Sequence, residues 1–154
     1  MRSSPASGGV QFRKLGASGL EASPVGLGCN PFGNEVDAPT AQAIVDRAIE
    51  LGVNYFDTAP SYYDGRSEEY LGRALKGHRS RVIVATKFAP PATRDHILAS
   101  CEASLRRLQT DVIDLYQAHR PDRQTPIDET LEVLNTLAQL CPVPRSCSHR
   151  VFPV

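Results

Sequence analysis

Four residues of types that often do chemistry end or follow three apolar segments of this sequence. The segments span residues 53–57, 82–87 and 112–116, and the four residues are Asp57, Tyr62, Lys87 and His119. Parallel strands of one sheet lie about 4.8 Å apart, and residues at their carboxyl ends line one rim. If the three segments are such strands, an acid, a phenol, an amine and an imidazole meet at one edge of the sheet.

Each of these residues, taken alone, has a plainer structural explanation. An aspartate after a strand commonly caps a turn, and a tyrosine is commonly a half-buried aromatic. A lone lysine usually ends a strand in solvent, and a lone histidine beside a proline is usually a loop residue. The presence of all four along successive segments is what favours a catalytic site.

The composition is that of an ordinary globular domain, with 41% hydrophobic and 22% charged residues among 154. Seventeen basic side chains balance seventeen acidic ones, so net charge provides no attraction to nucleic acid or to a membrane surface. No apolar run approaches the roughly 18 residues of a membrane span, and the N-terminus lacks the apolar core of a secretory signal. We therefore expect a cytoplasmic protein with a small-molecule partner, no nucleic acid and no membrane.

The four cysteines indicate neither disulfides nor a metal site. They form no CxxC pair, and without a secretory signal their even number is no argument for disulfides. Cys141, Cys147 and His149 are close in sequence, but a C-x5-C-x-H spacing is not a familiar zinc pattern. We expect reduced thiols and no bound metal.

The chain alternates between strand-like and helix-like patterns after a short N-terminal hairpin. The hairpin turns at residues 16–19, and apolar residues then recur alternately as buried strands and as one face of a helix. The expected strands are 24–28, 53–57, 81–87 and 111–116, and the expected helices include 67–75 and segments beginning near 41, 93 and 125. This order predicts four βα units with parallel strands and right-handed crossovers.

Local signals refine two of these helices. Ser67 is expected to cap the second helix, with Glu68 and Glu69 favoured near its positive N-terminal end. The buried face of the last helix is expected to consist of Leu131, Leu134 and Leu137.

The pattern alone leaves two α/β architectures open, a part of a (β/α)8 barrel or an open doubly wound sheet. The first βα loop, residues 26–33, lacks the G-x-G-x-x-G spacing of a dinucleotide-binding turn. Any nucleotide would therefore be held in another way.

Four motifs resemble the N-terminal half of an aldo-keto reductase, from about residue 12 to about residue 140. They are the segment 14–28, Asp57-Thr-Ala-x-x-Tyr62 with Gly65-x-Ser67-Glu68, Ala85-Thr-Lys87, and Asp114-Leu-Tyr-x-x-His119. Their order and spacing match the family, and each motif ends an expected strand. The resemblance implies a partial (β/α)8 TIM barrel and an NADPH-dependent oxidoreductase that reduces aldehyde, ketone or sugar carbonyls.

The resemblance also implies roles for individual residues. Tyr62 would be the proton donor, Lys87 and Asp57 its tuning partners, and His119 the group that orients the substrate carbonyl. Gly28, Cys29 and Asp57 would contact the cofactor. The chemistry agrees, because a free phenol has a pKa of about 10 and a nearby ammonium favours the phenolate. Hydrogen bonds from a phenol and an imidazole would stabilise the charge that develops on the carbonyl oxygen.

The two ends of the chain are expected to differ from the domain between them. Residues 1–10 read as a disordered leader, residues 11–140 as a truncated barrel domain, and residues 141–154 as an irregular tail rich in proline. A full barrel typically takes about 250 residues. The departure from the family pattern near residue 140 suggests, as a hypothesis, a frameshifted or alternatively spliced end.

A truncated barrel leaves a second function open. In the family, later strands supply most of the contacts to the adenosine and phosphate portions of the cofactor. The alternative is therefore a catalytically inactive fragment, or a non-catalytic interaction subunit of reductase fold. The last parallel strand would also be an exposed edge, through which the chain could self-associate.

Overall fold

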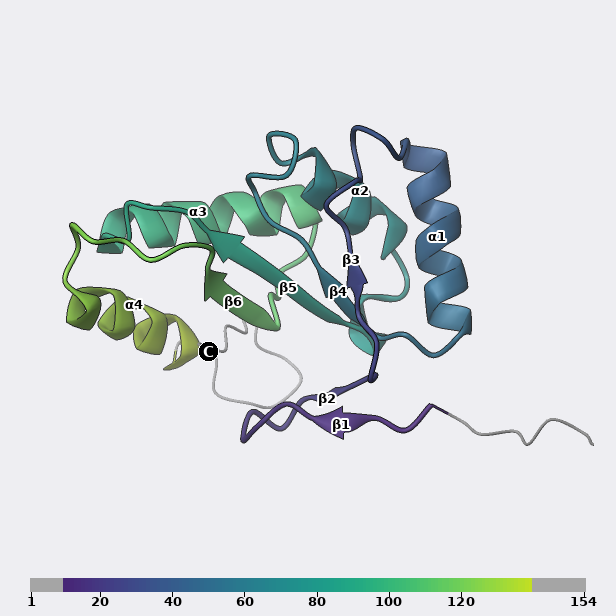
Figure 1. The fold of residues 1–154 in the computed structure, drawn as a ribbon, viewed down its shortest axis with the longest axis horizontal. Coiled ribbons are helices and arrows are strands. Elements are labelled where there is room, and N and C mark those ends of the chain that lie inside the picture. The colour runs from purple at the N-terminus through teal and green to yellow at the C-terminus, as the bar shows by residue number, and fades with distance from the viewer. Residues whose placement is uncertain (1–9, 140–154) are drawn as a thin grey trace, which may run out of the picture.

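A parallel sheet with helices packed along it forms the body of the chain (Figure 1). The computed structural model describes residues 10–139. The sheet order is β3-β4-β5-β6, with every neighbouring pair parallel, and the strands are β3 (Leu27–Gly28), β4 (Tyr55–Asp57), β5 (Ile83–Phe88) and β6 (Leu115–Ala118). Strands that are neighbours in sequence are therefore neighbours in space, as in one wall of a barrel.

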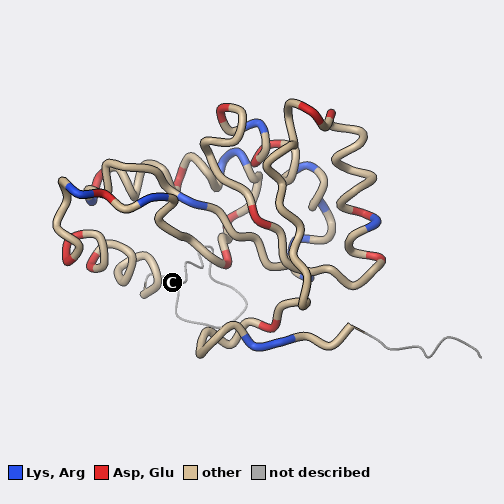
Figure 2. Tube along the Cα trace, in the orientation of Figure 1, with Lys and Arg blue, Asp and Glu red and all other residues tan. Residues whose placement is uncertain are grey.

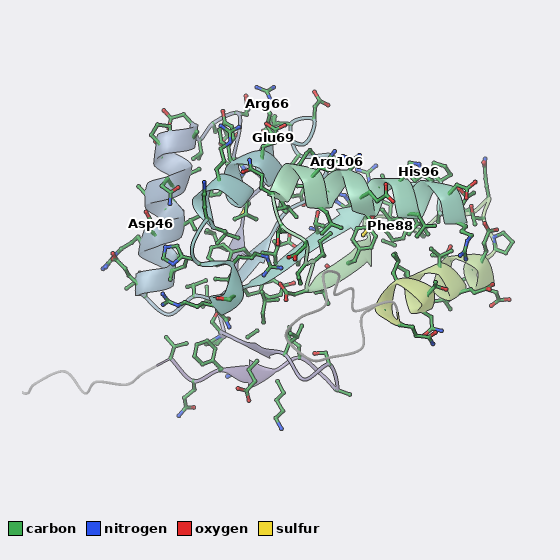
Figure 3. All side chains as sticks on the ribbon, turned by 180° about the vertical axis from the view of Figure 1, so that it is seen from behind. Asp46, Arg66, Glu69, Phe88, His96 and Arg106 are labelled. Carbon is green, nitrogen blue, oxygen red and sulfur yellow. The ribbon has the colours of Figure 1, made fainter. Side chains whose placement is uncertain are left out.

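Each strand of this sheet is followed by a helix. The helices are α1 (Ala38–Glu50), α2 (Arg66–Ala74), α3 (Arg94–Leu108) and α4 (Ile127–Gln139), and a short 3-10 turn at Arg79–Arg81 precedes β5. Helix α2 packs between α1 and α3, and α3 also contacts α4 and β5. Seen from behind, α2 and α3 lie in front of the sheet (Figure 3). The predicted fold, a partial (β/α)8 barrel of four βα units, is confirmed.

The predicted hairpin is also present, as β1 (Arg13–Lys14) and β2 (Glu21–Ala22) in antiparallel pairing. It lies beside the ends at which the sheet strands begin (Figure 1). Asn54, just before β4, holds it there: its Oδ1 accepts from the Ser23 backbone N–H at 2.7 Å, and its Nδ2 donates to the Glu21 carbonyl at 2.8 Å. The opposite, carboxyl edge of the sheet stays clear of the hairpin.

The core lies between the sheet and the helices. Phe56, Val84 and Tyr116 from the strands are fully buried, and they join Leu71 and Ile97 from α2 and α3 in one apolar cluster. Lys and Arg are interspersed with Asp and Glu along the described chain (Figure 2). None of the helices within residues 10–139 is long and apolar enough to cross a membrane.

Three local expectations were wrong. Gly65, with φ +85°, occupies the position before α2, whereas Ser67 lies inside the helix and is fully buried. The fourth strand was expected at 111–116 and is Leu115–Ala118. Just before it begins, the Asp114 carboxylate accepts from Arg79 and from the Val84 backbone N–H, so Asp114 serves as a side-chain acceptor ahead of the strand. Leu131 is 54% exposed, and Val133 takes its place beside Leu134 and Leu137.

The expected leader and tail fall almost wholly outside the described residues. Residues 1–9 and 140–154 are not described, so the predicted boundaries at 10 and 140 stay predictions. The frameshift hypothesis, which concerns the segment after residue 140, stays a hypothesis as well.

Candidate active site

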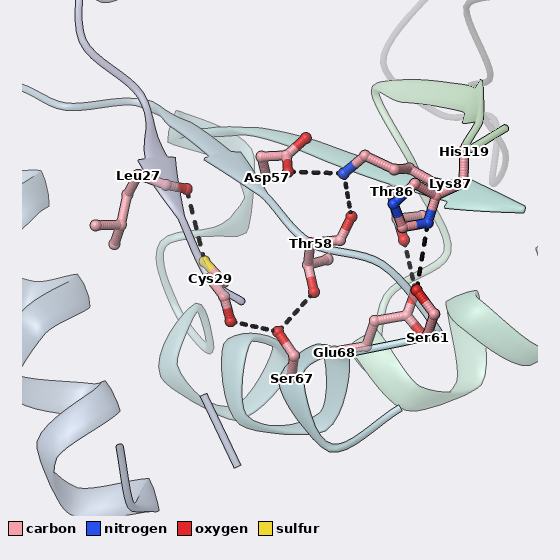
Figure 4. Close-up of polar contacts among 10 residues, drawn as sticks. All are labelled: Leu27, Cys29, Asp57, Thr58, Ser61, Ser67, Glu68, Thr86, Lys87 and His119. Atoms are coloured by element: carbon pink, nitrogen blue, oxygen red, sulfur yellow. Dashed lines mark hydrogen bonds and ion pairs between the residues drawn. The ribbon is translucent and has the colours of Figure 1, made fainter. Parts of the chain in front are cut away.

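The structure brings the four predicted side chains together at the carboxyl edge of the parallel sheet, where Figure 4 shows Asp57, Lys87 and His119. Asp57 is the last residue of β4, and Lys87 lies near the end of β5. His119 directly follows β6, and its backbone N–H donates to the Phe88 carbonyl at 2.8 Å. Tyr62 lies in the turn between β4 and α2. Strand register explains the convergence, because Asp57 pairs with Ala85 and the alternation of β5 brings Lys87 to the same face two residues later.

Lys87 and Asp57 form a partly buried ion pair. The Lys87 Nζ donates to Asp57 Oδ1 at 2.7 Å and to the Thr58 carbonyl at 2.8 Å. The lysine side chain is 14% exposed and the aspartate side chain 31% exposed. These two charge-assisted hydrogen bonds fix the position of the ammonium group beside the turn that carries Tyr62. The same Nζ lies 5.3 Å from the centroid of the Tyr62 ring.

His119 faces the same tyrosine. The two rings meet edge to face, with centroids 5.7 Å apart and planes at 87°. Burial, aided by the positive charges of Lys87 and Arg120 and opposed by Asp57, lowers the pKa of His119 below its ordinary value. The lowered pKa favours the neutral imidazole, which keeps one N–H to donate.

Ser61 is a contact of this histidine that the sequence analysis missed. Its Oγ lies 3.3 Å from His119 Nδ1, across 58 residues of sequence. A serine beside a tyrosine in a turn carries no sequence signal for such a contact. If the Ser61 hydroxyl donates to Nδ1, the ring proton is on Nε2, and if it accepts from Nδ1, the ring proton is on Nδ1, so Ser61 can set which tautomer His119 adopts.

Gly28 at the end of β3 and Cys29 directly after it, two of the predicted cofactor contacts, have different surroundings. Gly28 is exposed, and a Cβ placed on it would meet no atom within 4 Å. Cys29 is fully buried, with its N–H donating to the Asp57 carbonyl at 2.8 Å and its carbonyl accepting from Ser67 Oγ at 2.7 Å. Burial and the nearby Asp57 raise the pKa of the Cys29 thiol, so it stays protonated.

Glu68 lies in the first turn of α2, as expected, but its burial and its partners were not anticipated from the sequence. Its side chain is fully buried. Oε1 accepts from Thr86 Oγ1 at 2.6 Å, and Oε2 accepts from Arg107 Nε at 2.5 Å. Glu68 is part of the Gly65-x-Ser67-Glu68 motif that resembles the family, but no residue near it in the sequence indicates that its partner is Arg107 on α3.

The turn that carries Tyr62 has an unusual backbone. Tyr63, Asp64 and Gly65 have φ values of 50°, 56° and 85°, three successive residues in the left-handed region. Residues other than glycine adopt this region at a cost, and such residues concentrate at functional sites. The backbone strain therefore lies directly beside the tyrosine.

Groups of three His, Cys, Asp or Glu side chains that could hold a metal ion do not occur within residues 10–139. Cys141, Cys147 and His149 lie outside the described residues, so the prediction for them is not tested.

A parallel sheet flanked by helices, with reactive side chains at its carboxyl edge, places this chain among the α/β barrels. A sequence model described as the aldo/keto reductase family matches residues 24–140. The chain belongs to the aldo/keto reductase family.

Curated relatives agree with this assignment. An uncharacterized oxidoreductase of Bacillus subtilis, YqkF, is 43% identical over 141 residues, covering 84% of this chain and 45% of that protein. Aldo-keto reductase YhdN of the same organism is 41% identical over 143 residues, covering 83% of this chain and 43% of that protein. A probable voltage-gated potassium channel subunit beta of Arabidopsis thaliana is 38% identical over 138 residues, with 82% and 42% covered.

Among solved structures, the holo form of aldo-keto reductase AKR11C1 from Bacillus halodurans is similar, with a TM-score of 0.78 and 36% identity. The match covers 94% of this chain and 51% of that chain. The chain thus spans about half the length of the relatives it matches.

Proposed function

We propose that this chain provides the catalytic half of a cytoplasmic NADPH-dependent oxidoreductase that reduces aldehyde, ketone or sugar carbonyls. Tyr62 is the proton donor, Lys87 and Asp57 support it, and His119 orients the carbonyl. One observation carries the proposal: the Lys87–Asp57 ion pair, 2.7 Å long, stands beside a tyrosine whose ring His119 also contacts. Packing alone does not require this set of four at a strand edge.

The side chains support proton transfer to a carbonyl oxygen. Among the described residues neither the Tyr62 hydroxyl nor His119 Nε2 has a hydrogen-bond partner, so both can face a substrate. Donors aimed at one oxygen stabilise the negative charge that develops on it during reduction. The Lys87 ammonium stabilises the phenolate that remains on Tyr62 after proton transfer, and Asp57 keeps the lysine charged. NADPH, when bound, supplies the hydride.

Residues of β3 and β4 fit the reactive end of such a cofactor. Gly28 leaves open space at the end of β3, so a flat ring can approach the backbone there. Asp57 uses Oδ1 for Lys87, and its Oδ2 has no partner among the described residues, so it can accept from a cofactor hydroxyl. The buried thiol of Cys29 points to the Leu27 carbonyl. A contact between Cys29 and the cofactor therefore stays a prediction.

Two measurements on the same sample test this proposal. Purified chain is titrated with NADPH while the cofactor's fluorescence is followed, and turnover is then measured on a panel of aldehydes, ketones and sugars. Saturable binding with turnover of at least one carbonyl class is expected. A folded, monodisperse chain that binds no NADPH would refute the assignment.

A second candidate is a non-catalytic interaction subunit or an inactive fragment. The identity with plant proteins described as probable potassium channel beta subunits favours the subunit, and the half-length match favours the fragment. Binding of NADPH without turnover of any carbonyl would support the subunit, and neither binding nor turnover would support the fragment.

Self-association is also part of the proposal. Within the described sheet β6 is an edge strand, and unpaired strand edges pair readily with another chain. A size measurement on the titrated sample tests it, with a dimer or larger species expected and a monomer contradicting it.

A further inference from the structure

We infer that the ion pair between the buried Glu68 and the partly exposed Arg107 positions the Tyr62 turn and the Lys87 end of β5. The inference rests on the proposed function and assigns a positioning role to two residues outside the set Asp57, Tyr62, Lys87 and His119. Three groups of contacts around the pair carry it.

The first contact joins the pair to the strand that bears the lysine. Thr86 directly precedes Lys87 in β5, and alternation along a strand points their side chains to opposite faces. The Lys87 side chain reaches Asp57, whereas Thr86 Oγ1 donates to Glu68 Oε1 at 2.6 Å. Thr86 and Glu68 are both fully buried, so this bond is shielded from water. Glu68 therefore binds β5 on the face opposite the Lys87 side chain, at the residue directly before Lys87.

The second contact joins the pair to the turn that bears the tyrosine. Gly65 closes the run of three left-handed residues that follows Tyr62, and a Cβ added there would collide with Arg107 Cδ and Nε. The arginine side chain thus lies directly against the strained backbone. A turn in a sparsely populated conformation persists only when its surroundings hold it, and Arg107 is one of those surroundings.

The third contact anchors the helix that carries Glu68. Ser67 Oγ lies 2.8 Å from Thr58 Oγ1 and donates to the Cys29 carbonyl at 2.7 Å. Glu68 then reaches α3 through Arg107, whose NH2 also lies 3.3 Å from Ser104 Oγ. The start of α2 is thereby fixed to the residues that directly follow β3 and β4 (Figure 4). On its other side it is fixed to α3 through Arg107.

The chain contains a matched pair at the other end of the same strand. Arg79 NH2 donates to Asp114 Oδ2 at 2.6 Å, and that oxygen also accepts from the Val84 backbone N–H at 2.9 Å. The exposed fractions of the two side chains are 23% and 10%, close to the 25% and 0% of Arg107 and Glu68. This second pair has the same chemistry but lies away from the Tyr62 turn, so breaking it controls for loss of stability.

The test compares Arg107→Gln, Arg107→Lys and Arg79→Gln by NMR on chains with 13C-labelled tyrosine. Tyr62→Phe assigns the Tyr62 ring signals. Arg107→Gln is expected to shift these signals and to reduce the Tyr62–His119 ring cross-peak several-fold. Arg107→Lys, which retains the charge, is expected to restore part of the cross-peak, and Arg79→Gln is expected to leave it at the wild-type intensity.

Unchanged Tyr62 signals in Arg107→Gln, or equal changes in Arg79→Gln, would overturn the inference. Should Arg107→Gln fail to fold, Thr86→Val breaks the bond on the other side of Glu68 and must produce the same displacement. None of these readouts needs NADPH or turnover. The inference can therefore fail while the proposed function stands, and the proposed function can fail while the inference stands.

Discussion

Replacing Glu68 tests how much the buried carboxylate contributes to the stability of the fold. The residue is fully buried, and it is the only acceptor that Thr86 Oγ1 and Arg107 Nε have among the described residues. Glu68→Gln keeps the shape and removes the charge. Glu68→Leu keeps a similar volume and removes both acceptors.

The two substitutions should differ in size. In Glu68→Gln the amide oxygen can accept from Arg107 and the amide nitrogen can donate to the Thr86 hydroxyl, so only the charge assistance is lost, about 1–2 kcal/mol. In Glu68→Leu the Thr86 hydroxyl is buried without a partner and the guanidinium loses its counter-charge. Breaking a buried pair by removing one partner costs about 3–5 kcal/mol. Because Arg107 is 25% exposed and keeps some hydration, the lower end, about 3 kcal/mol, applies.

Urea denaturation of the wild type and both variants measures these differences as shifts of the unfolding midpoint at unchanged slope. The expected order of stability is wild type, then Glu68→Gln, then Glu68→Leu. A leucine variant as stable as the wild type, or more stable, would refute the reasoning, because it would show that the desolvation of the pair offsets its attraction.

Three further outcomes follow from single residues. Burial lowers the pKa of His119, so the midpoint of its NMR titration should lie below about 6.5, and a midpoint at or above that value would contradict this. Because the histidine of the unfolded chain then binds a proton more readily than that of the native chain, the free energy of unfolding should fall as the pH is lowered through this range. Gly72→Ala should destabilise the fold by about 1–3 kcal/mol in thermal unfolding despite alanine's helix preference, because its Cβ would meet the backbone carbonyl of Leu108, and a more stable variant would disprove the contact. Ser67→Ala should cost about 1–3 kcal/mol in urea, since it leaves the buried Cys29 carbonyl without that donor, and an unchanged midpoint would argue against the bond.

The order of the elements could be predicted from the sequence because it depends on local pattern. Helical spacing from Ala41 to Ile49 and the β-branched run before Lys87 each define an element without reference to any other part of the chain. Parallel strands with short connections then place Asp57, Lys87 and His119 at one edge, whatever the detailed packing. The placement of these residues at one edge of the sheet could therefore be predicted from the sequence, whereas the side-chain contacts around them could not.

The errors concern contacts between distant segments. An acidic residue in the first turn of a helix is normally solvated and stabilised by the helix dipole, so Glu68 had an adequate local explanation. Its burial depends on Arg107, which lies 39 residues further along the chain and on another helix. Likewise, whether Leu131 or Val133 faces the core depends on how α4 is rotated against α3, which the spacing of apolar residues does not determine.

The central claim is that Tyr62 donates a proton during carbonyl reduction, and the pair of variants Tyr62→Phe and Tyr63→Phe tests it most directly. The two tyrosines are neighbours in one turn, both are partly exposed, and each variant loses only a hydroxyl. NADPH affinity and the turnover number are measured for both variants with the best carbonyl substrate. The account predicts unchanged affinity in both and a turnover number reduced about 10²- to 10⁴-fold in Tyr62→Phe alone. Comparable turnover in wild type and Tyr62→Phe, or an equal loss in Tyr63→Phe, would contradict it.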